Sequence, residues 1–284
     1  MLDATKMVIN SCKCIDNVEL ADFNPHLLIG RVLSDDIICY NGFPITNTSI
    51  VDGYGCKQKD LLDNHDGEFS HDGEFRLTGW SRAGDYHITG EQDDQGSPTC
   101  CYVTTGGSVP LEFDVVIPME HAKLKNDGGI VTFKGLGTNY VVPKNNNIRL
   151  PGCDIRCGEV VMRKGIRITG AGIGILAMSG AEKVPVYRKV KVGVMSTGNE
   201  VEDLGDGRKG ETGRIWDCNR PMLIGELLTM GGFLEVVDLG IVRDLRERVE
   251  EGFEKGLEGG CDVIVSTGGV SVGDKDFVKM RGGG

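Results

Sequence analysis

Short apolar runs that alternate with helical patterns mark the last third of the chain. The runs at 190–195, 234–239 and 263–265 are rich in Val, Ile and Leu, and they predict three strands, the last of them buried. Between the first two, a capping-type residue and a proline at 217–221 predict the start of a helix, which the glycines at 231–232 would end. Strands and helices in this order are typical of a parallel βαβαβ sheet with right-handed crossovers.

Two further helices are expected from the spacing of apolar side chains. Asp244 is expected to open the first of them. Its apolar side chains recur at every fourth residue, which predicts one apolar face: Leu245, Val249, Phe253 and Leu257. The second helix covers the small residues at 170–180, and Thr169 is placed to cap its start.

The middle of the chain carries short apolar alternations that are broken by Gly, Asn and Asp. From about 56 to 144 this pattern predicts an all-β region, with strands at 115–117 and 129–133 as examples. Residues 27–39 are expected to be extended as well.

A tandem repeat lies inside this β region, at 65–70 and 71–75, and each copy begins with a His-Asp pair. Two such pairs would suit a metal ion. A short duplication that lengthens a surface hairpin loop explains the same residues without a ligand, so both interpretations stay open.

Composition narrows the possible functions. The 284 residues are enough for two or more domains with sizeable cores. A formal net charge of −11 argues against duplex nucleic acid as a partner, although a local basic pocket on an acidic protein would still hold a small anion. No apolar run is long enough for a membrane span, and residues 1–6 lack the order of a signal peptide, so we expect a cytoplasmic protein.

Ten cysteines are many for a chain of this length. Three close pairs occur among them: Cys12 and Cys14, Cys100 and Cys101, and Cys153 and Cys157. None of these pairs has the Cys-x-x-Cys spacing of a zinc site, so free thiols in a reducing compartment are expected.

The strongest chemical signal follows the last predicted strand, in the stretch 266–276. Gly268 and Gly269 carry no side chains, so backbone N–H groups there can approach an anion closely. Asp274 and Asp276 follow, and their carboxylates suit a divalent metal ion or a positively polarised group. Together these features favour a phosphorylated or oxyanionic ligand, whereas a Gly-Gly pair alone would be a turn.

The carboxyl ends of the three predicted strands should meet at one edge of the sheet, where ligands of open α/β sheets bind. Three loops therefore converge on one candidate site that combines hydroxyl groups, glycine backbone and carboxylates. Its candidate ligand-binding residues are Ser196, Thr197, Gly198, Thr267, Gly268, Gly269, Ser271 and Asp274. Its other acidic residues are Glu200, Asp244 and Asp276.

Nine short motifs run in order from about residue 28 to 279. They are GRVL at 30–33, SIVDGY at 49–54, SRAG at 81–84, TGGSVP at 105–110, NIRLPGCDI at 147–155, STGNE at 196–200, DCNR at 217–220, DLGIVRD at 238–244 and the Gly-Gly loop at 266–276. In this set and order the chain resembles the molybdopterin molybdotransferase family, which includes bacterial MoeA and the E domain of gephyrin. The residues VSVG after the glycines favour this transferase branch over the adenylating relatives, whose loop is of the TGGTG type.

The resemblance implies an α/β multidomain fold. A linker domain carries an inserted all-β domain, and a MogA-like parallel α/β (βαβαβ) domain follows. The implied boundaries are 1–47 and 145–187 for the linker domain, 48–144 for the β domain and 188–284 for the MogA-like domain. The C-terminal β-barrel domain of the family is expected to be absent.

The resemblance also implies a function in molybdenum cofactor biosynthesis. The expected enzyme is a transferase that inserts molybdate into adenylylated molybdopterin and releases AMP, with Mg²⁺ or another divalent cation. The family's functional residues fall on Asp52, Thr105, Asp154, Glu200, Asp244 and Asp276. Of these, Glu200, Asp244 and Asp276 are the metal candidates.

Two partners follow from the same resemblance. A homodimer is implied, because Asp52 and Thr105 match family residues that face the Gly-Gly loop of the second subunit. A MogA-like adenylyltransferase is a further expected partner, since the substrate is adenylylated.

One departure from the family keeps a second class of function open. The family's pair of lysines and its Pro-Gly-Lys-Pro segment are not found here, so we expect a C-terminally truncated chain that lacks the positive side of the site. The retained acids favour an enzyme. The missing lysines favour a non-catalytic gephyrin-like scaffold or an inactive truncated remnant.

Overall fold

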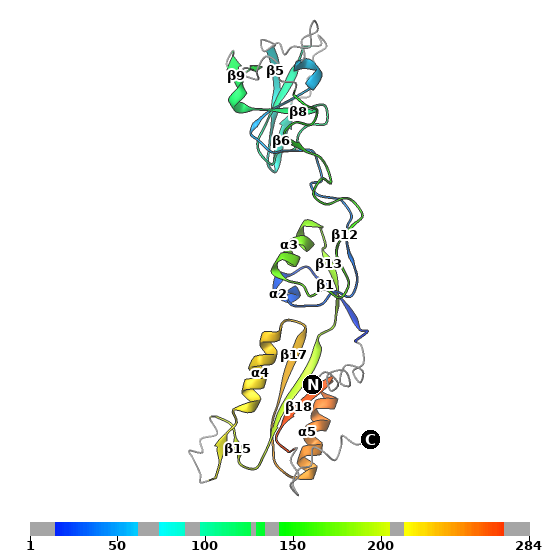
Figure 1. Ribbon diagram of the computed structural model, residues 1–284, viewed down its shortest axis with the longest axis vertical. Coiled ribbons are helices and arrows are strands. Elements are labelled where there is room, and N and C mark those ends of the chain that lie inside the picture. The colour runs from blue at the N-terminus through cyan, green and yellow to red at the C-terminus, as the bar shows by residue number, and fades with distance from the viewer. Residues whose placement is uncertain are drawn as a thin grey trace. The chain divides into compact units, whose positions relative to one another are not determined.

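A computed structural model describes residues 15–61, 74–88, 97–125, 129–133, 142–204 and 213–269, and Figure 1 shows its ribbon. The chain divides into two compact units. We call them the α/β unit (Met1–Ile37, Met162–Ala177 and Ala181–Gly284) and the β unit (Ile38–Val161 with Met178–Gly180). Their sheets and helices agree with the predicted α/β multidomain class, and the domain boundaries given above stay predictions.

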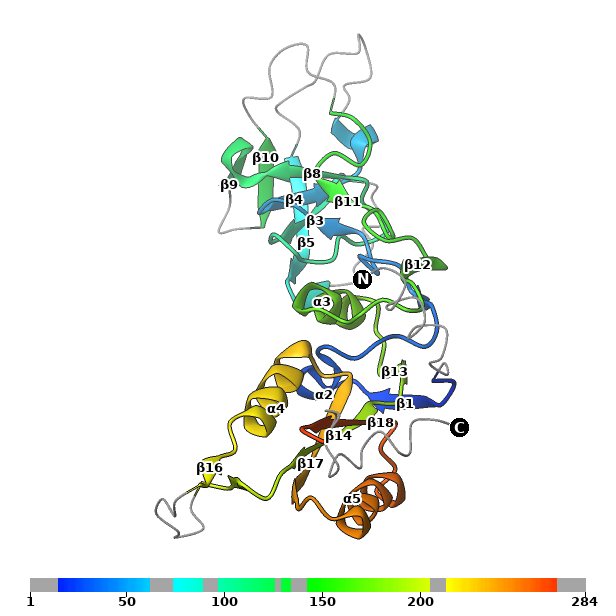
Figure 2. The same ribbon diagram turned by 60° about the horizontal axis from the view of Figure 1, so that its bottom comes forward.

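A three-stranded parallel sheet forms the centre of the α/β unit. Figure 2 shows β14 (Val190–Thr197), which pairs with β17 (Leu234–Val242) on one side and β18 (Val263–Thr267) on the other. In the register of the sheet, Val192 lies opposite both Val236 and Val263. The predicted βαβαβ order is confirmed, and β17 and β18 continue past the expected ends at 239 and 265.

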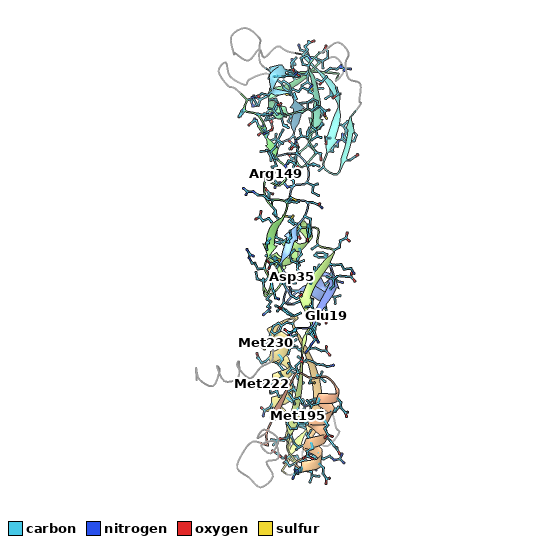
Figure 3. All side chains as sticks on the ribbon, turned by 90° about the vertical axis from the view of Figure 1, so that its right-hand side faces the viewer. Glu19, Asp35, Arg149, Met195, Met222 and Met230 are labelled. Carbon is cyan, nitrogen blue, oxygen red and sulfur yellow. The ribbon has the colours of Figure 1, made fainter. Side chains whose placement is uncertain are left out.

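The helix α4 (Asn219–Met230) connects β14 to β17, and it ends as predicted at Gly231, whose φ is 129°. Only glycine adopts this conformation readily, which explains the stop. Met222 and Met230 of α4 are more than half exposed, whereas Met195 of β14 is fully buried (Figure 3).

The helix α5 (Arg246–Glu258) packs on the sheet through Val249 and two glycines. A Cβ on Gly252 would lie 3.0 Å from Val242 Cγ2, and one on Gly256 would lie 2.6 Å from Ile264 Cδ1, so these glycines let the helix approach the strands closely. The predicted apolar face was therefore wrong at its two ends. Leu245 and Leu257 are 58% and 60% exposed, because the two glycines define the buried face.

The predicted start of α5 was wrong as well. The N-cap position belongs to Leu245, and no side chain caps the helix there. The Asp244 carboxylate instead accepts a hydrogen bond from the backbone N–H of Asn199, on the loop after β14. A side chain that was expected to cap a helix is thus part of the carboxyl edge of the sheet.

The described part of the α/β unit also contains four shorter strands and two helices. β1 (Val18–Asp22) pairs with β13 (Lys183–Tyr187) in an antiparallel ladder. The helices are α2 (Pro25–Leu28) and α3 (Gly170–Met178), and the short strands β15 (Val201–Glu202) and β16 (Ile215–Trp216) form a separate parallel pair.

Side-chain caps fix the starts of α2 and α3. Asn24 Oδ1 accepts a 3.0 Å hydrogen bond from the His26 N–H, so the expectation of an extended chain was wrong for residues 27 and 28, which belong to α2. Thr169 Oγ1 accepts a 3.2 Å hydrogen bond from the Gly172 N–H, which confirms the predicted cap of α3.

A seven-stranded sheet forms the β unit, in the order β8-β4-β7-β5-β10-β9 with β6 paired to β5. The strands are β4 (Gly53–Cys56), β5 (Glu74–Arg82), β6 (Asp85–Ile88), β7 (Thr99–Val103), β8 (Val115–Pro118), β9 (Ala122–Lys125) and β10 (Ile130–Phe133). In its core, Phe133 packs edge to face on Phe75 and Tyr54, with ring centroids 4.9 and 6.3 Å apart. The all-β prediction for this region is confirmed.

Shorter elements flank this sheet. β2 (Ile37–Cys39) pairs with β12 (Glu159–Met162), and β3 (Thr48–Ser49) pairs with β11 (Ile148–Arg149). Two 3₁₀ turns, η1 (Gln58–Leu61) and η2 (Met119–His121), complete the unit. Most of the tandem repeat at 65–75 lies outside the described residues.

Within the described residues, no helix combines the length and apolar character that a membrane span requires. The cysteines described by the structure are free thiols. Burial raises the pKa of the Cys100 and Cys101 thiols to about 12, so both are protonated and unreactive at neutral pH.

Candidate functional site

Three side-chain hydroxyls connect β14 and β18 where the two strands end. Ser196 Oγ and Thr267 Oγ1 share a 2.8 Å hydrogen bond, and Thr197 Oγ1 donates a 3.1 Å hydrogen bond to the Thr267 carbonyl. Ser196 and Thr197 are nearly buried, at 1% and 6% exposure. The predicted ligand-binding residues Ser196, Thr197 and Thr267 are therefore brought together, and they fix the position of the loop that follows β18.

That loop begins with two glycines in left-handed conformations, Gly268 with a φ of 82° and Gly269 with a φ of 67°. A Cβ on Gly268 would lie 2.6 Å from the Thr197 carbonyl oxygen and 2.8 Å from its hydroxyl oxygen. Both the conformation and the space demand glycine at this position. Backbone N–H groups in turns that contain such residues form concave sites for phosphate and other oxyanions.

The loop after β14 is tied to the end of β17 by reciprocal hydrogen bonds. The Asn199 N–H donates to Asp244 Oδ2 and the Asp244 N–H donates to Asn199 Oδ1, both at 3.2 Å. Arg243 donates to the carbonyl oxygens of this loop, with a 2.8 Å bond to that of Asn199. Asp244 therefore lies at the same edge of the sheet as the hydroxyl cluster.

Glu200 folds back over its own loop at this edge. A Cβ on Gly198 would lie 2.8 Å from Glu200 Oε2, so glycine at 198 makes room for the carboxylate. Gly198 in turn donates a 3.1 Å backbone hydrogen bond to the Val242 carbonyl. Glu200, Gly198 and Asp244 thus belong to one connected set of loops at the carboxyl ends of β14 and β17.

A buried arginine, Arg220, is connected to this edge of the sheet by hydrogen bonds. The sequence analysis did not identify this residue. Arg220, 6% exposed, donates to Asp217 Oδ2 at 2.9 Å and also pairs with Asp203 and Asp238. Asp217 in turn accepts a 3.0 Å hydrogen bond from Ser196 Oγ. The chain Arg220–Asp217–Ser196–Thr267 therefore links the start of α4 to the glycine loop.

Within this network, Asp217 and Arg220 keep each other in the ionised form. Burial alone would raise the pKa of Asp217, but hydrogen bonds from Arg220 and Ser196 outweigh it and lower the pKa. Burial alone would lower the pKa of Arg220, and the hydrogen bonds to Asp217 and Asp238 raise it instead. The signal in the sequence was the DCNR motif, which places an acid three residues before an arginine at a helix start.

In the β unit, the predicted site residues Asp52 and Thr105 are in direct contact. Asp52 Oδ1 accepts a 2.6 Å hydrogen bond from the Thr105 N–H and a 2.9 Å hydrogen bond from its hydroxyl. Both bonds lower the pKa of Asp52 below its usual 3.8, and the backbone bond has the larger effect. This carboxylate is therefore an acceptor at neutral pH and not a proton donor.

The predicted site residue Asp154 also lies in the β unit, where it is paired with Arg149. Its Oδ1 accepts a 3.4 Å contact from the Cys153 thiol, and both residues line a hollow of about 520 Å³. Nothing in the described contacts connects Asp154 with the Asp52–Thr105 pair.

Three of the predicted site residues, Ser271, Asp274 and Asp276, lie outside the described residues. Among the residues that are described, no group of three His, Cys, Asp or Glu side chains is close enough to hold a metal ion. Glu200 and Asp244 supply carboxylate oxygens, the ligand type that Mg²⁺ prefers, and the predicted third ligand is Asp276.

Comparisons with known proteins agree with the motifs. A family described as "MoeA N-terminal region (domain I and II)" matches residues 2–180, and one described as "Probable molybdopterin binding domain" matches residues 193–280. A molybdopterin molybdenumtransferase of Haemophilus influenzae is 33% identical over 250 residues, which are 88% of this chain and 56% of the relative. Gephyrin of Dictyostelium discoideum is 29% identical over 301 residues, which cover 98% of this chain and 39% of the relative.

Solved structures show the same similarity. A crystal structure of the molybdopterin biosynthesis MoeA protein of Pyrococcus horikoshii has a TM-score of 0.72 at 27% identity, and the match covers 94% of this chain and 65% of that one. A second structure of a MoeA protein from Pyrococcus has a TM-score of 0.71 at 26% identity, over 93% and 62%. The chain spans about half the length of the curated relatives it matches.

Proposed function

The chain belongs to the MoeA family, and on that premise we propose that it acts in molybdenum cofactor biosynthesis as a molybdopterin molybdenumtransferase. The proposed reaction inserts molybdate into adenylylated molybdopterin and releases AMP. The observation that carries the proposal is the glycine loop after β18, whose left-handed Gly268 and Gly269 follow directly on the Ser196–Thr267 hydroxyl pair.

The role we propose for this loop is to bind phosphate. Backbone N–H groups at Gly268 and Gly269 supply neutral donors for phosphate oxygens, and the absence of a Cβ lets the phosphate come close. The hydroxyls of Ser196 and Thr267 already hold each other and Asp217, so they keep the loop in a conformation that is ready to bind. A prearranged loop loses little entropy when it takes up its ligand.

We propose the metal ion at the acidic part of the same edge, with Glu200 and Asp244 among its ligands and Asp276 as the third. The donor set fits Mg²⁺, because it consists of carboxylate oxygens without sulfur or imidazole. A divalent cation there would neutralise charge on the anionic substrate. Asp244 is positioned for this by its two hydrogen bonds with Asn199, which leave Oδ1 without a bond to another described residue.

Asp52 and Thr105 lie in the other unit, and we propose that they serve the glycine loop of a second copy in a homodimer. Because Asp52 is held ionised, it would accept a hydrogen bond from the substrate or from an attacking water. Asp154 is proposed to belong to the same part of the site. A MogA-like adenylyltransferase is the proposed source of the adenylylated substrate.

The experiment is a measurement of AMP release by the purified chain. Adenylylated molybdopterin is supplied with Mg²⁺, and AMP is quantified by chromatography with and without molybdate. The transferase function predicts AMP release that depends on molybdate and on the divalent cation. Tight binding of the substrate without any AMP release would instead favour the scaffold function that the gephyrin resemblance left open.

A further inference from the structure

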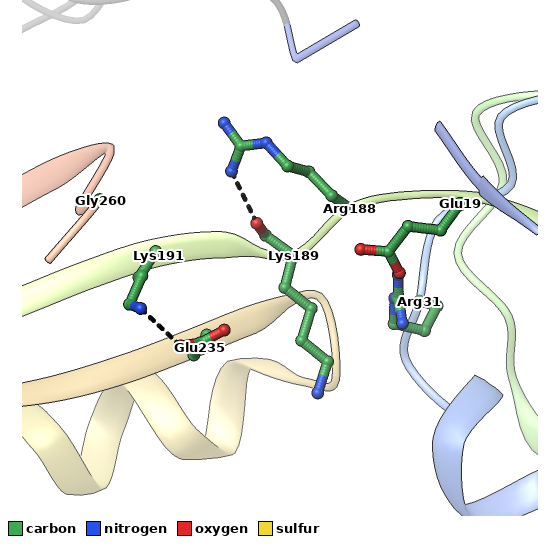
Figure 4. A pocket seen from close by; sticks show the side chains of 7 residues that line it. All are labelled: Glu19, Arg31, Arg188, Lys189, Lys191, Glu235 and Gly260. Carbon is green, nitrogen blue, oxygen red and sulfur yellow. Dashed lines mark hydrogen bonds and ion pairs between the residues drawn. The ribbon is translucent and has the colours of Figure 1, made fainter. Parts of the chain in front are cut away.

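A polar hollow lies in the α/β unit, apart from the hollow beside Asp154 in the β unit. The residues that line it have no part in the proposed reaction. It has a volume of about 390 Å³, and its walls come from β1, the segment after α2, the start of β14 and the start of β17 (Figure 4). Four cationic side chains line it against two carboxylates. In a chain with a net charge of −11, this local excess of positive charge is unusual.

One of the cations is buried and incompletely bonded. Arg31 is 6% exposed, and its Nη2 donates to Glu19 Oε2 at 2.6 Å and to the Tyr187 carbonyl at 2.8 Å. Its buried Nε has no acceptor among the described residues. Burying a guanidinium with an unused donor is costly, so the two described partners of Arg31 satisfy this cation only in part.

A second cation in the hollow, Lys189, has no carboxylate partner among the described residues. Figure 4 shows its side chain between the Lys191–Glu235 pair and the Arg31–Glu19 pair. Lys191 is engaged with Glu235 at 3.0 Å, whereas the Lys189 ammonium forms no ion pair with another described residue.

The remaining cation is held rigidly at the rim. Arg188 donates two 2.6 Å hydrogen bonds to the Asp262 carboxylate and one of 2.9 Å to the Lys189 carbonyl. These bonds fix the backbone from which Lys189 projects. The site therefore combines a fixed backbone, a buried guanidinium and a free ammonium.

We propose that this hollow binds the phosphate group of a small phosphorylated ligand. A phosphate dianion would accept from the Lys189 ammonium and from Arg31, and both cations favour tetrahedral oxyanions. Glu19 competes with the phosphate for Arg31, because its carboxylate is paired with the Arg31 guanidinium. The Glu19 side chain is itself 52% exposed. Because the Glu19 side chain is half-exposed and can turn into solvent, the phosphate displaces it from Arg31.

The test is calorimetric titration of the purified chain with inorganic phosphate at low ionic strength, repeated with glycerol phosphate as the ester. Three variants make it specific. Lys189→Gln removes the free ammonium, Glu19→Gln weakens the competitor but keeps an acceptor oxygen, and Lys183→Gln is the control. Lys183 is an exposed lysine of β13 that pairs with Asp22 and does not line the hollow.

We expect saturable binding at one site, weakened about tenfold by Lys189→Gln. Binding should be unchanged by Lys183→Gln and tightened about threefold by Glu19→Gln. If inorganic phosphate binds more tightly, the ligand is free phosphate. If glycerol phosphate binds more tightly, the ligand is a phosphate ester. The proposal is overturned by an absence of saturable binding, by equal losses in the Lys189 and Lys183 variants, or by weaker binding in Glu19→Gln.

Discussion

The hydroxyl groups of Ser196 and Thr267 share a 2.8 Å hydrogen bond across the neighbouring parallel strands β14 and β18. Ser196 also donates to Asp217, which accepts from the buried Arg220. The glycine loop is thus connected through four side chains to the start of α4.

We predict that Thr267→Val lowers the free energy of unfolding by about 1 kcal/mol, the usual contribution of a hydrogen bond. The valine keeps the shape of the side chain and removes the hydroxyl. Urea unfolding followed by tryptophan fluorescence measures the change. Thr229→Val is the control, since the Thr229 hydroxyl bonds only to the Glu226 carbonyl on the exposed side of α4. Equal losses in both variants would mean that the strand-to-strand bond adds nothing.

Arg220→Met should destabilise the protein by about 3–5 kcal/mol, because it leaves the buried Asp217 without its counter-charge. Arg248→Met is the matched control. Arg248 is an exposed arginine on α5 that pairs with Glu251, and its loss should change the free energy of unfolding by less than about 0.5 kcal/mol. Chemical unfolding of both variants gives the comparison. A difference below about 1 kcal/mol between them would show that the Arg220 network is not a structural centre.

The central parallel sheet was predictable, because each of its strands is a short run rich in Val, Ile and Leu that ends at glycine or polar residues. Only the Asp217–Arg220 part of the network has a local signal in the sequence, because Asp203 and Asp238 are brought to Arg220 by the fold. The face of α5 was misjudged for a related reason. Apolar periodicity points to large side chains, whereas Gly252 and Gly256 make the closest approach to the strands.

At the candidate site, the sequence suggested residues but did not show how they contact one another. Asp52 and Thr105 were named separately through the family resemblance, and the structure shows two hydrogen bonds between them. Asp244 was expected as a helix cap because an acid before a helical pattern usually is one. In the structure, Asp244 is held by two hydrogen bonds with Asn199, which lies 45 positions earlier in the chain.

Thr105→Val should raise the pKa of Asp52 toward the usual 3.8, because the hydroxyl that helps to stabilise the carboxylate is lost. Carbon-13 NMR of the aspartate carboxyls across an acid titration reports this value directly. Thr46→Val serves as the control, because the Thr46 hydroxyl contacts Ser108 and not Asp52. An unchanged pKa in Thr105→Val would show that the Thr105 hydroxyl does not contribute to the shift, which would then come from the backbone N–H of residue 105.

The Arg188–Asp262 pair makes stability depend on pH. Hydrogen bonds from Arg188 lower the pKa of Asp262 from 3.8 to about 2, so the folded protein holds this carboxylate ionised more strongly than the unfolded chain does. The stabilisation is fully present above about pH 5 and is lost as the pH falls through the pKa of the folded state. Asp262→Asn should therefore destabilise the protein more at pH 6 than at pH 3 in urea unfolding. A difference that stays constant between these two pH values would argue against the pair as its source.

The central claim is that the loop at Gly268 holds the phosphate of molybdopterin, and the most direct measurement is equilibrium binding of molybdopterin, followed by pterin fluorescence. Gly268→Ala is compared with Gly225→Ala, a helical glycine of α4 whose added Cβ meets no atom within 4 Å. We predict that Gly268→Ala weakens binding by about tenfold or more, because an alanine there is strained and collides with Thr197. Gly225→Ala should bind as the unmodified chain does. Unchanged binding by a folded Gly268→Ala variant would contradict the account.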